Sequence, residues 1–238
     1  MSVTPVQPPG ENRLLALLPR EVREQLAPHL TLLELGLRHG LYKPNEPIEH
    51  VYFPLSGVCS LVITMADGTI FEVATVGNEG MVGLPVFLGT ESIPGDAFVQ
   101  VAGQAFQLPA EVLRQETATG GAFHELLHRY TQTLLNQISQ TAVCNRAHSI
   151  QQRCGRWLLM THDRMGAAPF TLTQEFLGQM LGVRRASVSA VASGLQQAGV
   201  IRYSRGVITV TDRAGLERVA CECYRIVRAE FDRLLGPS

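Results

Sequence analysis

The sequence predicts an α+β protein with a β-barrel of the jelly-roll type in front, a long helix in the middle and a winged helix-turn-helix at the end. Three observations predict this fold. Short β-rich runs separated by turn residues fill the stretch from about residue 30 to residue 108. Apolar residues recur at helical spacing from Phe123 onward. Residues 171–210 then show two short helical patterns joined at a glycine and followed by a hairpin pattern.

Composition favours an ordinary globular chain. The 238 residues, 45% apolar and 17% charged, suffice for one or two packed domains. No stretch approaches the roughly 18 uninterrupted apolar residues of a membrane span. Residues 1–10 are proline-rich and lack a basic segment leading into an apolar one. We therefore expect a disordered leader and a cytoplasmic protein without membrane contact.

The charge is distributed unevenly along the chain. Residues 1–120 hold 6 Lys/Arg against 13 Asp/Glu, whereas residues 121–238 hold 14 Arg against 8 Asp/Glu. All basic residues of the second half are arginines, which bind phosphate and guanine in a planar, bidentate way. The second half is therefore the expected polyanion-binding part, unless its arginines only form a solvated face.

In the first half, Asn12 is expected to cap a short helix or a pair of helices, whose apolar stripe is Leu14, Leu15, Leu18, Val22 and Leu26. The expected strands are Tyr52-Phe53, Val58 to Thr64, Phe71 to Val76 and Ala97 to Ala102. Asp67-Gly68, flanked by apolar runs, predicts a hairpin turn. Many short strands at this spacing indicate a barrel or jelly roll.

The middle of the chain is predicted to be helical from Pro109, with an interruption at Gly120-Gly121. The helix beyond carries one long apolar seam, formed by Phe123, Leu127, Tyr130, Leu134, Ile138 and Ala142. So regular a seam is typical of coiled-coil packing, which predicts a homodimer held by Phe123, Leu127, Tyr130, Leu134 and Ile138. The alternative is that the seam packs only on its own barrel.

Three segments follow as the expected domain organisation: helices and a sensor-type barrel over residues 1–118, the long helix over 119–147, and the winged helix-turn-helix with a last helix over 148–238. The last segment should open with a helix from Ser149 to Arg164 that closes near Gly166. A final helix is expected from Leu216 to Leu235, packed on the winged domain or on a partner subunit.

The helix-turn-helix pattern is the most informative one. Thr173 can cap a helix over Gln174 to Leu181, and Gly182 permits a tight turn. A second helix from Arg185 to Ala198 follows. Two strands around Ser204-Arg205-Gly206, within Val200 to Val210, would form the wing.

This order of elements predicts binding to double-stranded DNA. A helix fits the major groove, so Arg185 at its start could donate two hydrogen bonds to guanine. An ordinary helical hairpin with solvated arginines is the alternative. The candidate DNA-binding residues are Thr173, Arg184, Arg185, Ser187, Ser189, Arg202 and Arg205, of which Arg202, Arg205 and Thr173 suit phosphates.

The helix-turn-helix segment from Leu172 to Val188, together with the Gly77-Asn-Glu-Gly-Met-Val-Gly83 stretch and the long helix, resembles the Crp/Fnr family of bacterial transcription regulators. The resemblance covers nearly the whole chain. It implies a double-stranded β-helix that binds an effector, a long dimerisation helix, and a winged helix that binds a palindromic operator and contacts RNA polymerase. It also implies a regulator and not an enzyme.

The chain departs from the cyclic-AMP-binding members of that family. They carry Gly-Glu and a later Arg-Ser or Arg-Thr, where this sequence has Gly83-Leu84 and Gly95-Asp96. A leucine and an aspartate cannot neutralise a cyclic phosphate, which disfavours cyclic AMP as the effector. The family's Arg, Glu and second Arg of the recognition helix fall on Arg185, Ala186 and Ala190, so we expect a different operator.

Several alternatives remain open at this stage. The barrel could bind an unknown effector, or it could be a ligand-free structural module. It could also be a cupin-like metal enzyme, although its only histidine is His50, with His39 just before the first clear strand. Candidate effector-binding residues are Asn78, Glu79, Gly80, Gly83, Asn136 and Gln137.

No cofactor or metal is expected. The cysteines are Cys59, Cys144, Cys154, Cys221 and Cys223, an odd and irregularly spaced set that favours reduced thiols over a disulfide framework. None lies near the N-terminus, where the family's oxygen sensor gathers its cluster ligands. Cys221 and Cys223 should point to different faces of one helix, which disfavours a shared metal. His124 and His128 have metal-compatible spacing but are expected to be solvated.

Overall fold

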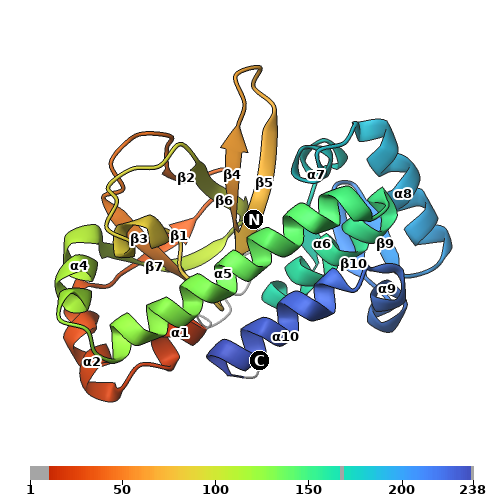
Figure 1. Cartoon of the computed structure of the whole chain (residues 1–238). Coiled ribbons are helices and arrows are strands. Elements are labelled where there is room, and N and C mark those ends of the chain that lie inside the picture. The colour runs from red at the N-terminus through yellow and green to blue at the C-terminus, as the bar shows by residue number, and fades with distance from the viewer. Residues whose placement is uncertain (1–10, 167–168, 237–238) are drawn as a thin grey trace, which may run out of the picture.

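The computed structural model describes residues 11–166 and 169–236 as a β-barrel, a long helix lying across it and a helical lobe at the C-terminal end (Figure 1). The leader predicted over residues 1–10 lies outside the described residues. The first element is α1 (Arg13–Ala16), capped as predicted by Asn12, whose side chain accepts a hydrogen bond from the Leu15 amide. Helix α2 (Arg20–Leu26) and a 3-10 turn (Ala27–His29) lead into the barrel.

The barrel consists of two antiparallel sheets. One has the strand order β1-β7-β3, the other β2-β6-β4-β5. This is the predicted jelly-roll architecture. The strands are β1 (Thr31–Leu35), β2 (Gly40–Tyr42), β3 (His50–Pro54), β4 (Val58–Thr64), β5 (Ile70–Val76), β6 (Asp96–Val101) and β7 (Gly103–Pro109), with the short helix α3 (Leu84–Phe87) between β5 and β6.

The sequence predicted β3, β4, β5 and β6 but missed β1, β2 and β7. Strand β1 is rich in leucine, a good helix former, and it becomes a strand because it pairs along its whole length with β7. The predicted hairpin turn is present: Gly68 has φ +82°, and the Asp67 carboxylate accepts a hydrogen bond of 2.9 Å from the Thr69 amide. The β4–β5 hairpin projects beyond the rest of the barrel and stands between it and the C-terminal lobe (Figure 1).

The long helix α5 (Ala122–Ala147) follows α4 (Ala110–Ala118) after the predicted break at Gly120-Gly121. Its apolar seam packs on its own barrel: Phe123, Leu127, Tyr130 and Leu134 are at most 6% exposed, and Ile138 is partly buried against the same core. The structure therefore shows the alternative interpretation of the seam, in which it packs on its own barrel. The four side chains from Phe123 to Leu134 are already covered and do not offer the predicted dimer contact, whereas Ile138 is only partly covered.

The C-terminal lobe begins with α6 (Ile150–Met165), which Ser149, the predicted start of the helix, caps at one end and Gly166 closes at the other. The lobe continues with β8 (Phe170–Thr171), α7 (Gln174–Leu181), α8 (Arg185–Gln197), β9 (Ile201–Ser204) and β10 (Val207–Val210), the strands forming a sheet in the order β8-β10-β9. The sequence missed β8, whose two residues form a strand only through pairing with β10.

The single helix predicted from Leu216 to Leu235 is wrong. The chain forms α9 (Arg213–Val219) and then α10 (Cys223–Leu235), because the backbone becomes extended at Ala220, with ψ 154°. That residue packs against Gly155 of α6, which has no side chain to keep it away. Helix α10 then runs back along α5 in the opposite direction (Figure 1).

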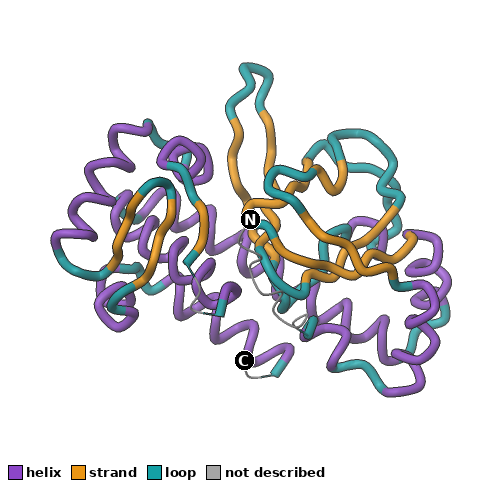
Figure 2. The backbone as a smooth tube through the Cα atoms, turned by 180° about the vertical axis from the view of Figure 1, so that it is seen from behind, coloured by secondary structure: helices purple, strands orange, loops and turns teal. Residues whose placement is uncertain are grey.

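The barrel and the C-terminal lobe share apolar contacts. Val58 and Val101 of the barrel belong to the same buried cluster as Trp157 and Phe176 of the lobe. The view from behind shows the two β-rich parts on either side of the projecting hairpin (Figure 2). Among the described residues, none of the helices combines the length and the apolar character needed to cross a membrane.

Candidate nucleic-acid interface and cavities

The helix-turn-helix is built as its sequence predicts. The Thr173 hydroxyl accepts a hydrogen bond of 3.1 Å from the Phe176 amide and so caps α7. Gly182 ends α7 in the left-handed conformation, and the Val183 amide bonds back to the Gly178 carbonyl at 2.9 Å. The inner faces of α7 and α8 are buried through Phe176, Leu177, Met180, Val188 and Leu195.

The candidate DNA-binding residues lie at two places in this lobe. Arg184 and Arg185 are exposed at the N-terminal end of α8, and Ser187 and Ser189 are half-buried one turn further on. Arg202 on β9 and Arg205 in the hairpin turn are both exposed. Thr173 is exposed as well, but its hydroxyl oxygen already caps α7. Backbone amides at the start of α8 add partial positive charge beside the two arginines.

The barrel meets the lobe at α7 and at Gly182, just before α8. A surface depression of about 370 Å³ lies between the tip of the β4–β5 hairpin and the helix-turn-helix, with Thr69 on one wall and Arg184 and Arg185 on the other. Phe98 of the barrel stacks edge-on against Phe176 of α7, with ring centroids 6.1 Å apart. The depression also exposes Gln179, which the sequence analysis did not single out because it has no motif around it.

A polar link between barrel and lobe runs through Glu72 of β5. Its carboxylate accepts hydrogen bonds from the Trp157 indole at 2.9 Å and from the Ser60 hydroxyl at 2.8 Å. Burial raises the pKa of Glu72 to about 7, although both hydrogen bonds favour the charged form. The folded protein therefore binds a proton here that the unfolded chain has released by neutral pH.

This linkage predicts a pH-dependent stability. Because the folded-state pKa is raised, the Glu72 contribution is complete below the unfolded pKa and is lost as pH rises through about 7. We expect Glu72→Gln to remove a fall of about 1–3 kcal/mol in the free energy of unfolding between pH 5 and pH 8. Urea titrations across that range measure it, with the exposed Glu21→Gln as control. Equal slopes for wild type and Glu72→Gln would contradict the prediction.

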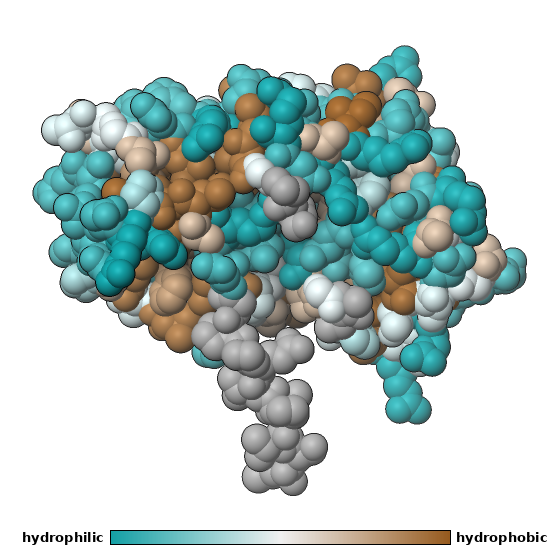
Figure 3. All heavy atoms as spheres, turned by 90° about the horizontal axis from the view of Figure 1, so that it is seen from below, coloured by the Kyte–Doolittle hydropathy of each residue, from teal (hydrophilic) through white to brown (hydrophobic). Residues whose placement is uncertain are grey.

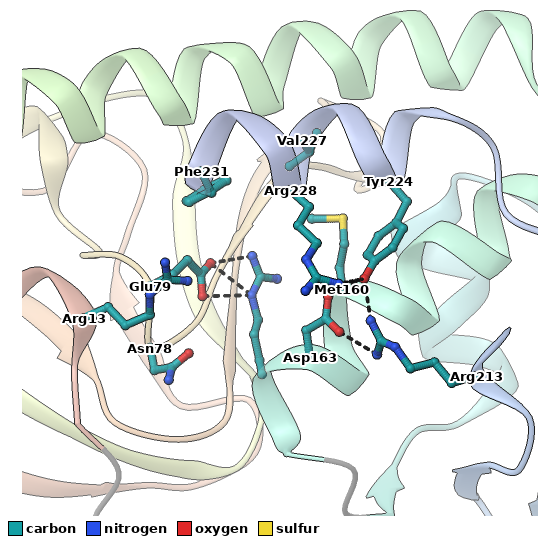
Figure 4. A pocket seen from close by; sticks show the side chains of 11 residues that line it. Arg13, Asn78, Glu79, Met160, Asp163, Arg213, Tyr224, Val227, Arg228 and Phe231 are labelled. Carbon is teal, nitrogen blue, oxygen red and sulfur yellow. Dashed lines mark hydrogen bonds and ion pairs between the residues drawn. The ribbon is translucent and has the colours of Figure 1, made fainter. Parts of the chain in front are cut away.

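The larger cavity lies below the barrel, between the Asn78-Glu79 loop, α6 and α10, and has a volume of about 460 Å³ (Figure 4). Four of the charged side chains on its wall pair with one another, whereas Arg13 and Arg228 lie near Asp232, outside the wall. Arg164 pairs with Glu79 at 2.6 Å, and Arg213 pairs with Asp163 at 2.6 Å. The Tyr224 hydroxyl donates to Asp163 at 2.8 Å.

The Glu79–Arg164 ion pair is buried, with side-chain exposures of 10% and 7%. Burial alone would raise the pKa of Glu79, but the guanidinium of Arg164 and its hydrogen bonds hold it below the ordinary value. Two glycines of the Gly77–Gly83 stretch permit close packing here. A Cβ at Gly77 would lie 2.5 Å from Cδ of Arg164, and one at Gly80 would lie 2.6 Å from the Tyr130 hydroxyl.

A second cavity of about 250 Å³ lies between the barrel and α5. It has Gly83, Leu84 and Gly95 on its wall, at the positions where the family resemblance places a phosphate site, and among the described residues no basic side chain lines it. Asp96 also lines the cavity, and its buried carboxylate oxygen Oδ1 has no hydrogen-bond partner within residues 11–166 and 169–236. The wall is otherwise almost entirely apolar, through residues such as Leu134 and Ile138.

The six predicted effector-binding residues do not share one cavity. Asn78 and Glu79 line the larger cavity, and Gly83 lines the apolar one. The other three line neither. Gly80 is packed under Tyr130, Asn136 donates to Glu230 of α10 at 2.8 Å, and Gln137 is buried and donates to the Thr75 carbonyl at 3.0 Å.

Two further predictions concern histidines and cysteines. His124 and His128 contact each other, with their Nε2 atoms 2.9 Å apart, and both pack edge-on against Phe87.

The prediction that Cys221 and Cys223 point to different faces of one helix is wrong. Cys221 precedes α10, and the helix break turns its sulfur into the same buried cluster as Cys223.

The fold and the candidate interface together define a class: a transcription regulator with a ligand-binding type of barrel and a DNA-binding winged helix-turn-helix. The family comparisons agree. Residues 38–119 match the cyclic nucleotide-binding domain, and residues 152–219 match the Crp-like helix-turn-helix domain. The chain belongs to the Crp/Fnr family of transcription regulators. This membership sets the cupin-like enzyme interpretation aside.

Solved structures share the fold at low sequence identity. FixK2 from Bradyrhizobium japonicum is 18% identical with a TM-score of 0.69, and the match covers 81% of this chain and 98% of FixK2. A CRP-family regulator from Thermus thermophilus is also 18% identical, with a TM-score of 0.66 over 79% of this chain and 96% of its own. The c-di-GMP responsive regulator CLP from Xanthomonas campestris is 15% identical, with a TM-score of 0.64 over 81% and 99%. No curated protein sequence matches the chain at a significant level.

Proposed function

We propose that the chain acts as a homodimer that binds a two-fold-symmetric operator through α8 in the major groove and the β9–β10 wing on the backbone. The observation that carries this proposal is the pair of exposed arginines, Arg184 and Arg185, at the start of the recognition helix α8. Arg202 and Arg205 on the wing suit phosphate contacts. Contact with RNA polymerase belongs to the proposal as an expectation from the family.

The proposed dimer surface is the exposed edge of α5 beside the apolar cavity, and not the covered seam from Phe123 to Leu134. Leu135 is 53% exposed and Val143 is 55% exposed. Thr131, Leu135, Ile138 and Ala142 follow one another at four-, three- and four-residue steps, the spacing of a coiled-coil seam. A second copy packed along this line would bury the exposed leucine and bring two lobes onto one DNA duplex.

The proposed effector site is the apolar cavity between the barrel and α5. An apolar wall without a basic side chain disfavours an anionic phosphate, because nothing would offset the cost of desolvating it. The unpartnered Asp96 oxygen suits a hydrogen-bond donor on an otherwise apolar ligand. Leu134 and Ile138 of α5 line this cavity, so a ligand there would bear directly on the dimerisation helix. A barrel that needs no ligand is the competing proposal.

The test combines site selection with a dimer variant. We expect the purified chain, without added ligand, to select symmetric sites from random duplex DNA, with affinity that falls steeply with salt. Leu135→Glu should yield a monomer and weaken binding to the selected site at least tenfold, because two half-sites are no longer linked. Leu37→Glu, at a leucine of similar exposure (52%) on the barrel, is the control.

Each result has a clear meaning. Monomeric Leu135→Glu with unchanged affinity for a full site would overturn the dimer proposal. Failure to select any sequence, with or without cell extract, would overturn sequence-specific DNA binding. Selection that appears only with extract would favour an effector over the ligand-free barrel.

A further inference from the structure

Three cysteines and a histidine converge where α5 ends and α10 begins. Cys144 lies in the last turn of α5 and His148 caps it, while Cys221 and Cys223 flank the start of α10. Their potential ligand atoms all lie within 4.8 Å of one another. The three cysteines are at most 3% exposed, and the His148 side chain is 12% exposed. Three cysteine sulfurs and one imidazole, all potential metal ligands, thus lie close together and are almost shielded from solvent.

The separations match those of a tetrahedral metal centre. The Cys144 and Cys221 sulfurs are 3.5 Å apart, and the Cys223 sulfur is 3.5 Å from Nδ1 of His148. Around a tetrahedral zinc ion, two thiolate sulfurs lie about 3.8 Å apart, and a sulfur and an imidazole nitrogen about 3.6 Å apart. We propose that Cys144, His148, Cys221 and Cys223 form a Cys3His site for one zinc-class divalent cation.

The surroundings suit the charge and orientation of such ligands. The Glu222 carboxylate lies 3.3 Å from Nε2 of His148, the arrangement that fixes an imidazole with its other nitrogen toward a metal. Gln140 donates a hydrogen bond of 3.1 Å to the Cys223 sulfur. The buried guanidinium of Arg156 interacts electrostatically with Cys144, which offsets the surplus negative charge of three thiolates on one divalent cation.

The site is structural, because four protein ligands leave no open position for a substrate. It joins two segments that are 77 residues apart in the chain, counted between Cys144 and Cys221. One ligand, His148, stands at the hinge between the long helix α5 and α6, the first helix of the DNA-binding lobe. A bound cation would therefore fix α10 and the lobe relative to the dimerisation helix. A disulfide between Cys144 and Cys221 would leave Cys223 and His148 without a role.

The test uses the full chain, purified with Zn²⁺ and dialysed. We expect about one zinc ion per chain by elemental analysis, and, after exchange with Co²⁺, the intense visible absorption of tetrahedral cobalt with thiolate charge transfer. Cys223→Ser and His148→Ala should each lower the retained zinc severalfold. Cys154→Ser is the matched control, since Cys154 is equally buried but lies in α6 within a different cluster.

A measurement on the wild-type protein covers the case of variants that fail to fold. Titration with a mercurial thiol reagent should release the zinc in step with the modification of about three thiols. A folded wild-type chain that retains neither Zn²⁺ nor Co²⁺ would overturn the proposal. So would a Cys144–Cys221 disulfide in the freshly purified, metal-free protein, or equal zinc loss in Cys154→Ser.

Discussion

Arg164→Met is expected to lower the free energy of unfolding by about 3–5 kcal/mol, because it leaves the Glu79 carboxylate buried without its counter-charge. Glu79 is 10% exposed in its side chain, and its partner also donates to the Thr75 hydroxyl and carbonyl. These bonds join the loop after β5 to the C-terminal end of α6. The loss should therefore loosen the barrel from the DNA-binding lobe as well as destabilise the chain.

Two control variants test whether the loss comes from the unpaired, buried Glu79 carboxylate. Arg20→Met breaks the exposed Arg20–Glu24 pair, with side-chain exposures of 80% and 62%, and should cost less than about 1 kcal/mol. Adding Glu79→Gln to Arg164→Met removes the stranded charge and should recover a large part of the loss. Denaturant titration measures all three variants. Equal effects of Arg164→Met and Arg20→Met would show that the buried pair does not hold the loop.

Arg185→Ala is expected to weaken binding to the selected operator by about 1–3 kcal/mol and to relax the base preference at one position of each half-site. Arg185 is exposed in the first turn of α8, where a side chain can reach a base edge while the helix lies in the major groove. Because both half-sites lose the same contact, the affinity of the dimer should fall more than that of a single half-site.

The Arg185 measurement compares specific and unrelated duplexes over a salt series. Arg202→Ala is the contrast, since a phosphate contact should weaken both duplexes alike and reduce the salt dependence. Arg23→Ala removes one exposed charge from α2, far along the chain from the lobe, and should leave both affinities unchanged. If Arg185→Ala weakens all duplexes equally, Arg185 is a phosphate contact and the base readout lies elsewhere on α8.

The parts of the fold that were predicted correctly are stabilised by interactions between residues that are close together in the chain. Asn12 and Thr173 cap helices because a short polar side chain reaches an amide two or three residues ahead. The turn at Asp67-Gly68 and the left-handed Gly182 are equally local. The candidate DNA-binding arginines could be predicted for the same reason, since helix, turn and wing follow one another without interruption.

The features that were missed or wrong depend on distant partners. The seam from Phe123 to Ile138 has the same periodicity whether a second copy or the barrel covers it, and only packing decides between the two. Strands β1 and β8 exist through their pairing with β7 and β10. The effector residues were chosen along one loop and one helix, and the structure places them around separate cavities.

The sequence by itself determined a barrel, a long helix, a winged helix-turn-helix and the arginines at the start of its recognition helix. Only the tertiary structure decided which face of α5 stays free, that Glu79 finds Arg164 across 85 residues, and that the chain breaks at Ala220 to bring Cys221 and Cys223 to Cys144. The physical reason is the distance along the chain between interacting residues. Caps and turns are satisfied by neighbours in the chain, whereas buried charges, apolar faces and metal ligands are satisfied by whichever segment the packed core brings to them.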